Sequence, residues 1–284
     1  MAVVATGFFD GVHIGHRKVI ETLLECAARR SERSLVLTFW PHPRTVLQND
    51  ARSLRLLTTM EEKRSILLDM GVDEVAVIPF SKDFAALTAE TYLEKVVKGR
   101  YGASAIVLGY DNRLGSDMLL PEKVVPVAGK LSLEAIVCPN VGNVSSTKIR
   151  AAVSEGDVTE ASAMLGYPYM LHGVVVGGNR LGRTIGFPTA NMKLYEPLKL
   201  VPGKGAYVTE VEVAGRTCYG MTNVDGAGKI ETHIFNFSED VYGLDIRLHF
   251  LDRIRHEMEF KSLDELKNQL CRDQEYCKKF IFEL

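Results

Sequence analysis

The first half of this chain alternates short apolar runs with longer amphipathic stretches, and this alternation limits the fold more strongly than any other sequence feature. The apolar runs are residues 2–6, 35–39, 75–80 and 105–110. The amphipathic stretches between them are residues 16–30, 60–70 and 89–100, and Thr58 and Thr59 precede Glu61 and Glu62 as capping residues of the second stretch would. Apolar runs of this length between helical patterns are typical of buried parallel strands joined by crossover helices. The sequence therefore predicts an α/β domain with a parallel sheet.

The pattern changes in the second half, where short strand-like runs are separated by turn residues. Residues 144–166 resemble two short helices, and strand patterns follow at 171–179, 206–215, 216–224, 229–237 and 245–251. Antiparallel strands with Gly-rich turns indicate a compact barrel or sandwich. Ser262, with Glu265 three residues later, has the spacing of a capping box and predicts a closing helix. We expect one domain at residues 1–166 and a second at residues 167–284.

Charge and cysteine content exclude several classes of protein. The chain has 34 Lys and Arg against 36 Asp and Glu, so it lacks the strongly basic surface that drives nonspecific nucleic-acid binding. It has no run of about 18 apolar residues, and its first residues resemble no signal peptide. Five scattered cysteines without a CxxC pair indicate neither a disulfide framework nor a thiolate zinc site. We therefore expect a cytoplasmic protein without nucleic-acid or membrane partners.

A glycine-rich segment, GFFDGVHIGH at residues 7–16, joins the first predicted strand to the first predicted helix. Backbone N–H groups and the helix dipole receive phosphate at such a position. The imidazoles of His13 and His16 can donate hydrogen bonds to triphosphate oxygens and stabilise charge that develops at the α-phosphorus during nucleotidyl transfer. The two histidines could instead bind a metal or cap the helix, although no Cys or acidic cluster nearby completes a metal site. We expect them to handle phosphate.

This segment resembles the HxGH motif of nucleotidyltransferases, and specifically that of the bacterial bifunctional riboflavin kinase/FAD synthetases. Two further segments are similar to that family, TFWPHP at residues 38–43 and SSTKIR at residues 145–150. Alone, SSTKIR would be an ordinary helix start, but its hydroxyls, amides and arginine can also surround the β- and γ-phosphates of ATP. The resemblance implies an ATP and phosphate site made of Gly7, Phe8, Asp10, Gly15, Ser145, Ser146, Thr147 and Arg150.

Residues 173–191, GVVVGGNRLGRTIGFPTAN, resemble the opening segment of the same family's riboflavin kinase domain. The repeated glycines permit close backbone approach to phosphate. Thr189 and Asn191 offer oxygen ligands to Mg²⁺, which prefers few protein ligands together with substrate phosphates. The expected ATP contacts of this segment are Gly177, Arg183, Gly186 and Pro188.

The strand pattern KIETHIFNF at residues 229–237 contains a candidate general base. Period-2 alternation predicts that Glu231 and His233 share one face with Phe235 and Phe237. A carboxylate on a largely apolar face can accept a proton from a primary alcohol as the alcohol attacks the γ-phosphorus of ATP. The resemblance implies this role for Glu231, because the family's base is the Glu of an E-x-H pair, whereas His233 is expected to be structural.

Four residues are expected beside the flavin. Asp111 and Asn112 lie in GYDNRLG at residues 109–115, a segment similar to the family's flavin-side loop, although Leu114 stands where the family usually has Phe. By resemblance, Arg255 and Glu257 border the flavin of the kinase domain. Loss of the aromatic residue at position 114 would weaken contact with an isoalloxazine ring.

The resemblance covers the whole chain and implies a Rossmann-like nucleotidyltransferase domain followed by a small antiparallel β-barrel kinase domain with a C-terminal helix. The second domain is expected to phosphorylate riboflavin to FMN, and the first to transfer AMP from another ATP to FMN, giving FAD and pyrophosphate. Mg²⁺ is expected in both sites, because each site must stabilise a charged phosphoryl or adenylyl transition state. One alternative is a riboflavin kinase with a weak or inactive adenylyltransferase domain. A second is a flavin-binding regulator without turnover.

Overall fold

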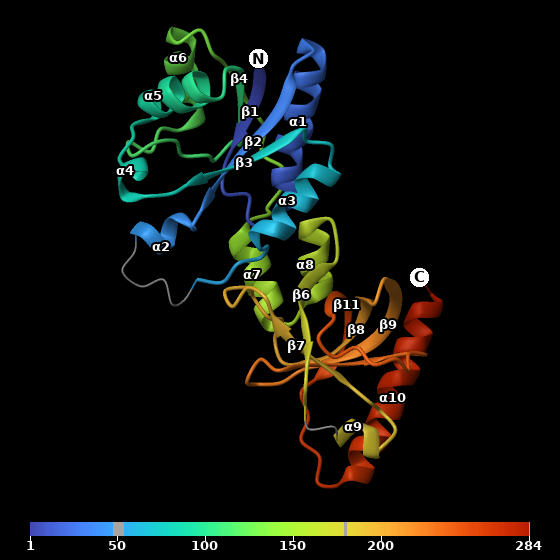
Figure 1. The fold of residues 1–284 in the computed structure, drawn as a ribbon. Helices are drawn as coiled ribbons and strands as arrows, with labels where there is room; N and C mark the ends of the chain where they lie inside the picture. Colours follow the sequence, from blue (N-terminus) through green and yellow to red (C-terminus); the bar gives the residue numbers. More distant parts are fainter. Residues whose placement is uncertain (48–53, 179–180, 284) are drawn as a thin grey trace. The chain divides into compact units, whose positions relative to one another are not determined.

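The computed structural model describes residues 1–47, 54–178 and 181–283, which form two compact units (Figure 1). Contacts divide the chain into residues 1–146 and 147–284. The boundary expected from sequence, at residue 166, lies further along the chain, after two helices that group with the second unit. Within the described residues, no helix is both long enough and apolar enough to cross a membrane.

The first unit is built on a parallel sheet of five strands in the order β3-β2-β1-β4-β5. The strands are β1 (Ala2–Thr6), β2 (Arg33–Trp40), β3 (Glu74–Pro79), β4 (Ala103–Leu108) and β5 (Glu134–Val137). The strand order reverses between the neighbours β1 and β4. Open α/β sheets bind ligands beyond the carboxyl ends of the strands at such a switch point. This rule directs attention to the loops that follow β1 and β4.

Helices cover both faces of this sheet, because successive strand residues point to opposite sides. Val4 and Leu37 pack in a buried cluster with residues of the π-helix η1, whereas Val3 and Val36 pack with residues of α1. The helical segments of the unit are α1 (Ile14–Arg30), α2 (Pro43–Leu47), α3 (Met60–Asp69), α4 (Lys82–Ala85), α5 (Ala89–Thr91), η1 (Tyr92–Arg100) and α6 (Pro121–Lys130).

The second unit is a closed antiparallel barrel with strand order β10-β7-β6-β11-β8-β9. Its strands are β6 (Tyr169–Val176), β7 (Ala190–Leu194), β8 (Gly205–Val213), β9 (Arg216–Val224), β10 (Ile230–Ile234) and β11 (Asp245–His256). Its helices are α7 (Ser146–Glu155), α8 (Val158–Leu165), α9 (Leu181–Thr184) and α10 (Leu263–Phe282). The parallel sheet, the barrel and the C-terminal helix confirm the predicted fold class.

The predicted helix starts are also confirmed. Thr59 caps α3 with a complete capping box to Glu62, and the Ser262 side chain accepts a hydrogen bond from the Glu265 N–H at the start of α10. The stretch 89–100 differs from expectation, because most of it is the π-helix η1 rather than an α-helix. Helix α6 was not predicted, since Pro126 and Gly129 interrupt its helical pattern.

Candidate active site

The loop after β1 brings the two histidines of the HxGH motif together. His13 is the N-cap of α1, and its Nδ1 accepts a hydrogen bond of 3.3 Å from the His16 backbone N–H. The two imidazole rings stack with their centroids 3.6 Å apart. His13 therefore caps the helix, which was one of the alternatives weighed from sequence, and the phosphate role of the two histidines stays a prediction.

Burial keeps both imidazoles neutral near pH 7. Burial lowers the pKa of His13, although the Asp111 and Asp10 carboxylates oppose the change. The pKa of His16 lies well below its usual value because of burial and because His13 and Lys63 would repel a second cation. The Nδ1 atom of His16 is buried and has no hydrogen-bond partner among the described residues. These rings can donate or accept hydrogen bonds without first losing a proton.

Asp10 has a structural position inside the glycine-rich loop. Its carboxylate accepts hydrogen bonds from the backbone N–H groups of Leu57 and Thr58, at 3.1 Å each for Oδ1. The Gly11 N–H donates to the Thr58 hydroxyl at 3.0 Å. Asp10 is only 4% exposed. These bonds fasten the glycine-rich loop to the segment that leads into α3, a link between distant residues that sequence reasoning missed.

The loop after β4 lies at the neighbouring strand end, as the switch point requires. Asn112 donates its side-chain N–H to the Thr6 carbonyl at 3.0 Å, so this amide joins the loop to the end of β1. Asp111 is close enough to His13 to influence its pKa. Leu114 is buried in the core cluster with Ala89 and Leu93. A buried position gives Leu114 a packing role that does not require it to contact a flavin.

The SSTKIR segment begins a helix as expected, with α7 starting at Ser146. The Ser146 hydroxyl donates a hydrogen bond of 3.0 Å to the Asp10 carbonyl oxygen. Ser145 and Ser146 thus belong to the first contact unit with Gly7, Phe8 and Gly15, whereas Thr147 and Arg150 fall in the second.

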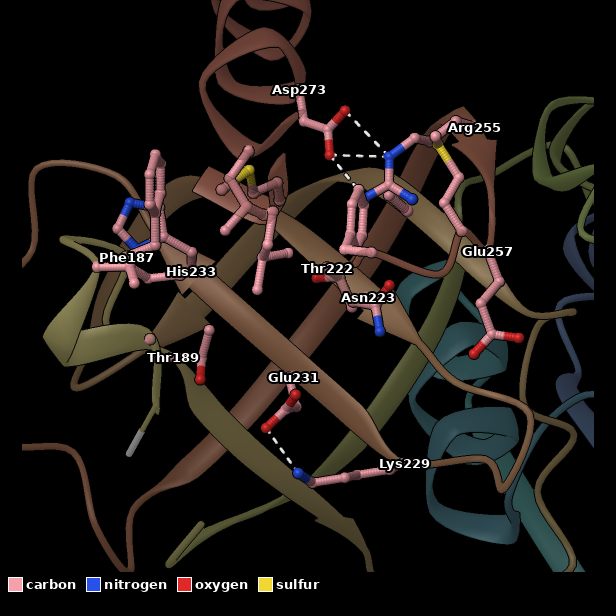
Figure 2. Close-up of a pocket in the computed structure, with 18 residues that line it drawn as sticks. Phe187, Thr189, Thr222, Asn223, Lys229, Glu231, His233, Arg255, Glu257 and Asp273 are labelled. Atoms are coloured by element: carbon pink, nitrogen blue, oxygen red, sulfur yellow. Dashed lines mark hydrogen bonds and ion pairs between the residues drawn. The ribbon is translucent and has the colours of Figure 1, made fainter. Parts of the chain in front are cut away.

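A cavity of about 280 Å³ lies in the barrel unit and holds Glu231 at its edge (Figure 2). Strand register explains the arrangement. Glu231 on β10 is directly opposite Asn191 on β7 and Asn223 on β9. Residues opposite one another share a face, so three polar side chains form a row across three strands. The next row is separate, because the buried hydroxyls of Thr209, Thr222 and Thr232 hydrogen-bond in sequence at 2.8 and 2.9 Å.

Glu231 forms an ion pair with Lys229, with Nζ and Oε1 2.7 Å apart (Figure 2). Both side chains are partly exposed, so solvent screens the pair. Lys229 is two residues before Glu231, at the end of the short turn after Asn223. The sequence analysis did not select Lys229. Its position two residues before Glu231 in a strand pattern would have indicated that the two side chains share a face.

The predicted alternation in β10 is confirmed up to Ile234. Ile230, Thr232 and Ile234 are buried, whereas Glu231 and His233 are partly exposed. The strand ends there and Asn236 has a positive φ of 53°, which turns the chain. The prediction that Phe237 shares the face of Glu231 is therefore wrong, and Phe237 lines a different cavity.

His233 has a structural contact, as expected. Its Nδ1 lies 2.8 Å from the Pro188 carbonyl oxygen, and burial lowers the pKa of the ring. A neutral imidazole must donate from Nδ1 to make this bond. His233 thereby positions the segment that carries Thr189.

A second, smaller cavity of about 70 Å³ is lined by Arg183, Pro188, Thr189 and Tyr242 among others. Thr189 lines both cavities. Gly186 has a φ of +90°, a conformation that favours glycine. Gly177 and Gly178 begin the predicted phosphate loop, and residues 179–180 of that loop lie outside the described residues.

Asn191, one of the two metal ligands predicted from the sequence, has a buried side chain. It is 6% exposed, and its Oδ1 has no hydrogen-bond partner among the described residues. An unsatisfied buried amide oxygen is costly unless a ligand occupies it. Oxygen ligands suit Mg²⁺, and the Thr189 hydroxyl is two residues away in the chain. The residues present therefore fit a magnesium ion.

The far side of the larger cavity is held by a buried ion pair that sequence reasoning missed. Arg255 Nη2 lies 2.9 Å from Asp273 Oδ2, and Nε donates to both carboxylate oxygens (Figure 2). The Asp273 side chain is only 2% exposed. Glu257 also lines the cavity and accepts a hydrogen bond of 3.3 Å from the Gly226 N–H. Asp273 lies on α10, eighteen residues from Arg255, so only the fold brings them together.

Two family models match successive parts of the chain. A family model described as FAD synthetase matches residues 1–150, and one described as riboflavin kinase matches residues 165–281. Bifunctional riboflavin kinase/FMN adenylyltransferases are similar over nearly the full length. The Escherichia coli K12 protein is 35% identical over 98% of this chain and 92% of its own, and the Bacillus subtilis protein is 33% identical over 100% and 93%.

A solved structure named as a macrolide-efflux protein from Streptococcus pneumoniae has a TM-score of 0.89 and 35% identity, over 98% of this chain and 93% of its own. That similarity supports the fold of each unit. The two family models and the bifunctional relatives indicate the activity.

Proposed function

This chain belongs to the family of bifunctional riboflavin kinase/FMN adenylyltransferases, and on that premise we propose how its residues divide the synthesis of FAD from riboflavin. The barrel unit phosphorylates riboflavin to FMN with ATP. The α/β unit transfers AMP from a second ATP to FMN and releases pyrophosphate. The observation that carries the kinase assignment is the larger cavity itself, whose lining brings the predicted base Glu231 together with Thr189 and Arg255.

In the barrel unit, the flavin occupies the larger cavity and the ATP phosphates approach from the smaller one. The Glu231 carboxylate accepts the proton of the primary alcohol of riboflavin as its oxygen attacks the γ-phosphorus. The bond from the γ-phosphorus to the bridging oxygen breaks, and ADP leaves with the electron pair. Arg183 neutralises phosphate charge, and Arg255 and Glu257 border the flavin. The Asp273 carboxylate fixes the position of Arg255.

In the α/β unit, a phosphate oxygen of FMN attacks the α-phosphorus of ATP, and pyrophosphate leaves with the electron pair of the broken bond. His13 and His16 donate hydrogen bonds to the phosphates and stabilise the developing charge. Ser145 and Ser146 bind the β- and γ-phosphates, and phosphate contacts of Thr147 and Arg150 stay a prediction from the sequence. Asp111 and Asn112 border the flavin, and Asn112 also orders its loop through the Thr6 carbonyl. No covalent enzyme intermediate is needed.

Thr189 and Asn191 would hold Mg²⁺ in the barrel unit, and the Asn191 oxygen, unpartnered among the described residues, supports this assignment. When bound, the ion neutralises phosphate charge. We expect Mg²⁺ in the α/β unit as well. Within the described residues, no cluster of three His, Cys, Asp or Glu side chains suits a metal, so substrate phosphates must supply most ligands there.

Product chromatography tests the proposed function. The purified protein is incubated with riboflavin, ATP and Mg²⁺, and separately with FMN, ATP and Mg²⁺. FAD from both mixtures is the expected result. FMN alone from the first mixture, with no product from the second, would leave a riboflavin kinase with an inactive α/β unit.

A further inference from the structure

Lys63 is a buried lysine beside the HxGH loop that the reaction described above does not use. It lies in the first turns of α3 and is 1% exposed. Its Nζ lies 3.6 Å from the centre of the Phe8 ring, inside the glycine-rich segment. Lysine is among the side chains least often fully buried, and when it is buried it is usually paired. A buried ammonium at this position therefore needs an explanation.

The surroundings of Lys63 do not neutralise its charge. Within the part of the chain that the structure describes, no carboxylate lies at ion-pair distance from its Nζ. Asp10 is near enough to favour the charged form, but the Asp10 carboxylate accepts hydrogen bonds from Leu57 and Thr58. The face of the Phe8 ring attracts the ammonium weakly. The ammonium thus contacts the Phe8 ring and is under the longer-range influence of Asp10.

Two further observations place this cation beside the histidines of the HxGH motif. Lys63 is close enough to His16 for the two charges to repel, and His16 carries a buried Nδ1 without a partner. Asp10 accepts hydrogen bonds from the N–H groups of residues 57–58, and the Gly11 N–H donates to Thr58, so the segment that leads into α3 is fixed against the glycine-rich loop. Lys63 is therefore held by the same contacts that shape the loop.

We propose that Lys63 is a further catalytic residue of the α/β unit, and that its ammonium group leaves the Phe8 ring to contact a phosphate oxygen of ATP during adenylyl transfer. This proposal rests on the proposed FMN adenylyltransferase activity. Lys63 transfers no proton. It stabilises the negative charge that moves onto pyrophosphate as the bond between the α-phosphorus and the bridging oxygen breaks.

The charge balance of the free site agrees with this role. Burial lowers the pKa of Lys63 to about 8, while His13 and His16 are neutral near pH 7. Lys63 is then the cation that the loop can offer when ATP arrives. The negative charge of the phosphates would raise the pKa of Lys63 again, because an opposite charge favours the ammonium form.

Substitution of Lys63 tests the proposal, with both reactions measured in each sample. Lys63→Met should lower kcat/KM for FMN adenylylation ~100-fold or more, the loss typical when one preorganised charge is removed, and leave riboflavin phosphorylation unchanged. Lys63→Arg should recover part of this loss. Arg64→Met, on the exposed next residue of α3, is the matched control and should change neither rate.

Adenylylation by Lys63→Met within twofold of wild type would overturn the role of Lys63 and leave the proposed function intact. Absence of FAD formation by the wild-type protein would overturn both. A second measurement follows the wild-type protein itself. NMR of the wild-type protein with ¹³C-labelled lysine should give a titration midpoint for Lys63 near 8 that rises when pyrophosphate and Mg²⁺ are added. The Lys63 signal is identified by its absence in Lys63→Arg, and an unchanged midpoint would contradict the proposal.

Discussion

The two units of this protein arrange phosphate chemistry in different ways. In the α/β unit most of the predicted site residues lie on or beside the loops after β1 and β4, and long-range hydrogen bonds hold the first of these loops, as between Asp10 and residues 57–58. In the barrel the groups lie on strands, where register alone aligns Glu231 with Asn191 and Asn223. A loop site can combine residues from many parts of the chain, whereas a strand site is fixed by the ladder that also stabilises the fold.

The largest expected effect separates the two sites. Glu231→Gln should reduce FMN formation by ~10³-fold, because the amide cannot accept the alcohol proton, while adenylylation of supplied FMN stays within twofold of wild type. Product chromatography with each substrate measures both rates. Glu210→Gln, on β8 and outside the larger cavity, is the matched control. Loss of both activities in Glu231→Gln would contradict separate sites.

The reciprocal change is His16→Ala, which should lower adenylylation ~10²-fold by removing a preorganised donor to the phosphates. Riboflavin phosphorylation in the same sample is expected to be unchanged and serves as the control. An equal fall in both rates would mean that His16 acts through the stability of the whole chain.

The third prediction concerns the stability of the barrel unit. Asp273→Asn removes one partner of a buried ion pair and leaves Arg255 without its counter-charge. The free energy of unfolding of the barrel should fall by about 3 kcal/mol, and KM for riboflavin should rise. Chemical denaturation followed by loss of kinase activity measures the first quantity. Glu275→Gln, an exposed carboxylate on the same helix, should have no effect, and an equal loss there would contradict the role of the pair.

The smallest effect is a pH dependence that should be larger in the α/β unit. Burial lowers the pKa of two histidines there, His13 and His16. In the barrel, burial lowers the pKa of one described histidine, His233. Below pH 6.5 the unfolded chain binds protons that the folded unit excludes, so stability falls as the pH drops through this value. The slope is at most about 1.4 kcal/mol per pH unit for each histidine.

Trp40, the single tryptophan, lies on β2 and reports unfolding of the α/β unit. Denaturation followed by its fluorescence should show lower stability at pH 5 than at pH 7, with a shallower dependence in His16→Gln. The same dependence in both proteins would show that His16 contributes nothing to it.

The sequence by itself determined the fold class, the helix starts at Thr59 and Ser262, and the alternation that exposes Glu231, because these depend on local periodicity and capping. It also gave the motifs that carry the family resemblance. It could not give the end of β10, since the positive φ of Asn236 follows from the turn that the barrel requires.

Only the tertiary structure decided which distant side chains meet. Lys63 looks like an ordinary polar residue of an amphipathic helix, and its burial against Phe8 depends on how α3 is fastened to the glycine-rich loop. Asp273 reaches Arg255 only because α10 packs on the barrel. Sequence periodicity says which face of an element is buried, but the partner of a buried charge is set by the packing of elements far apart in the chain.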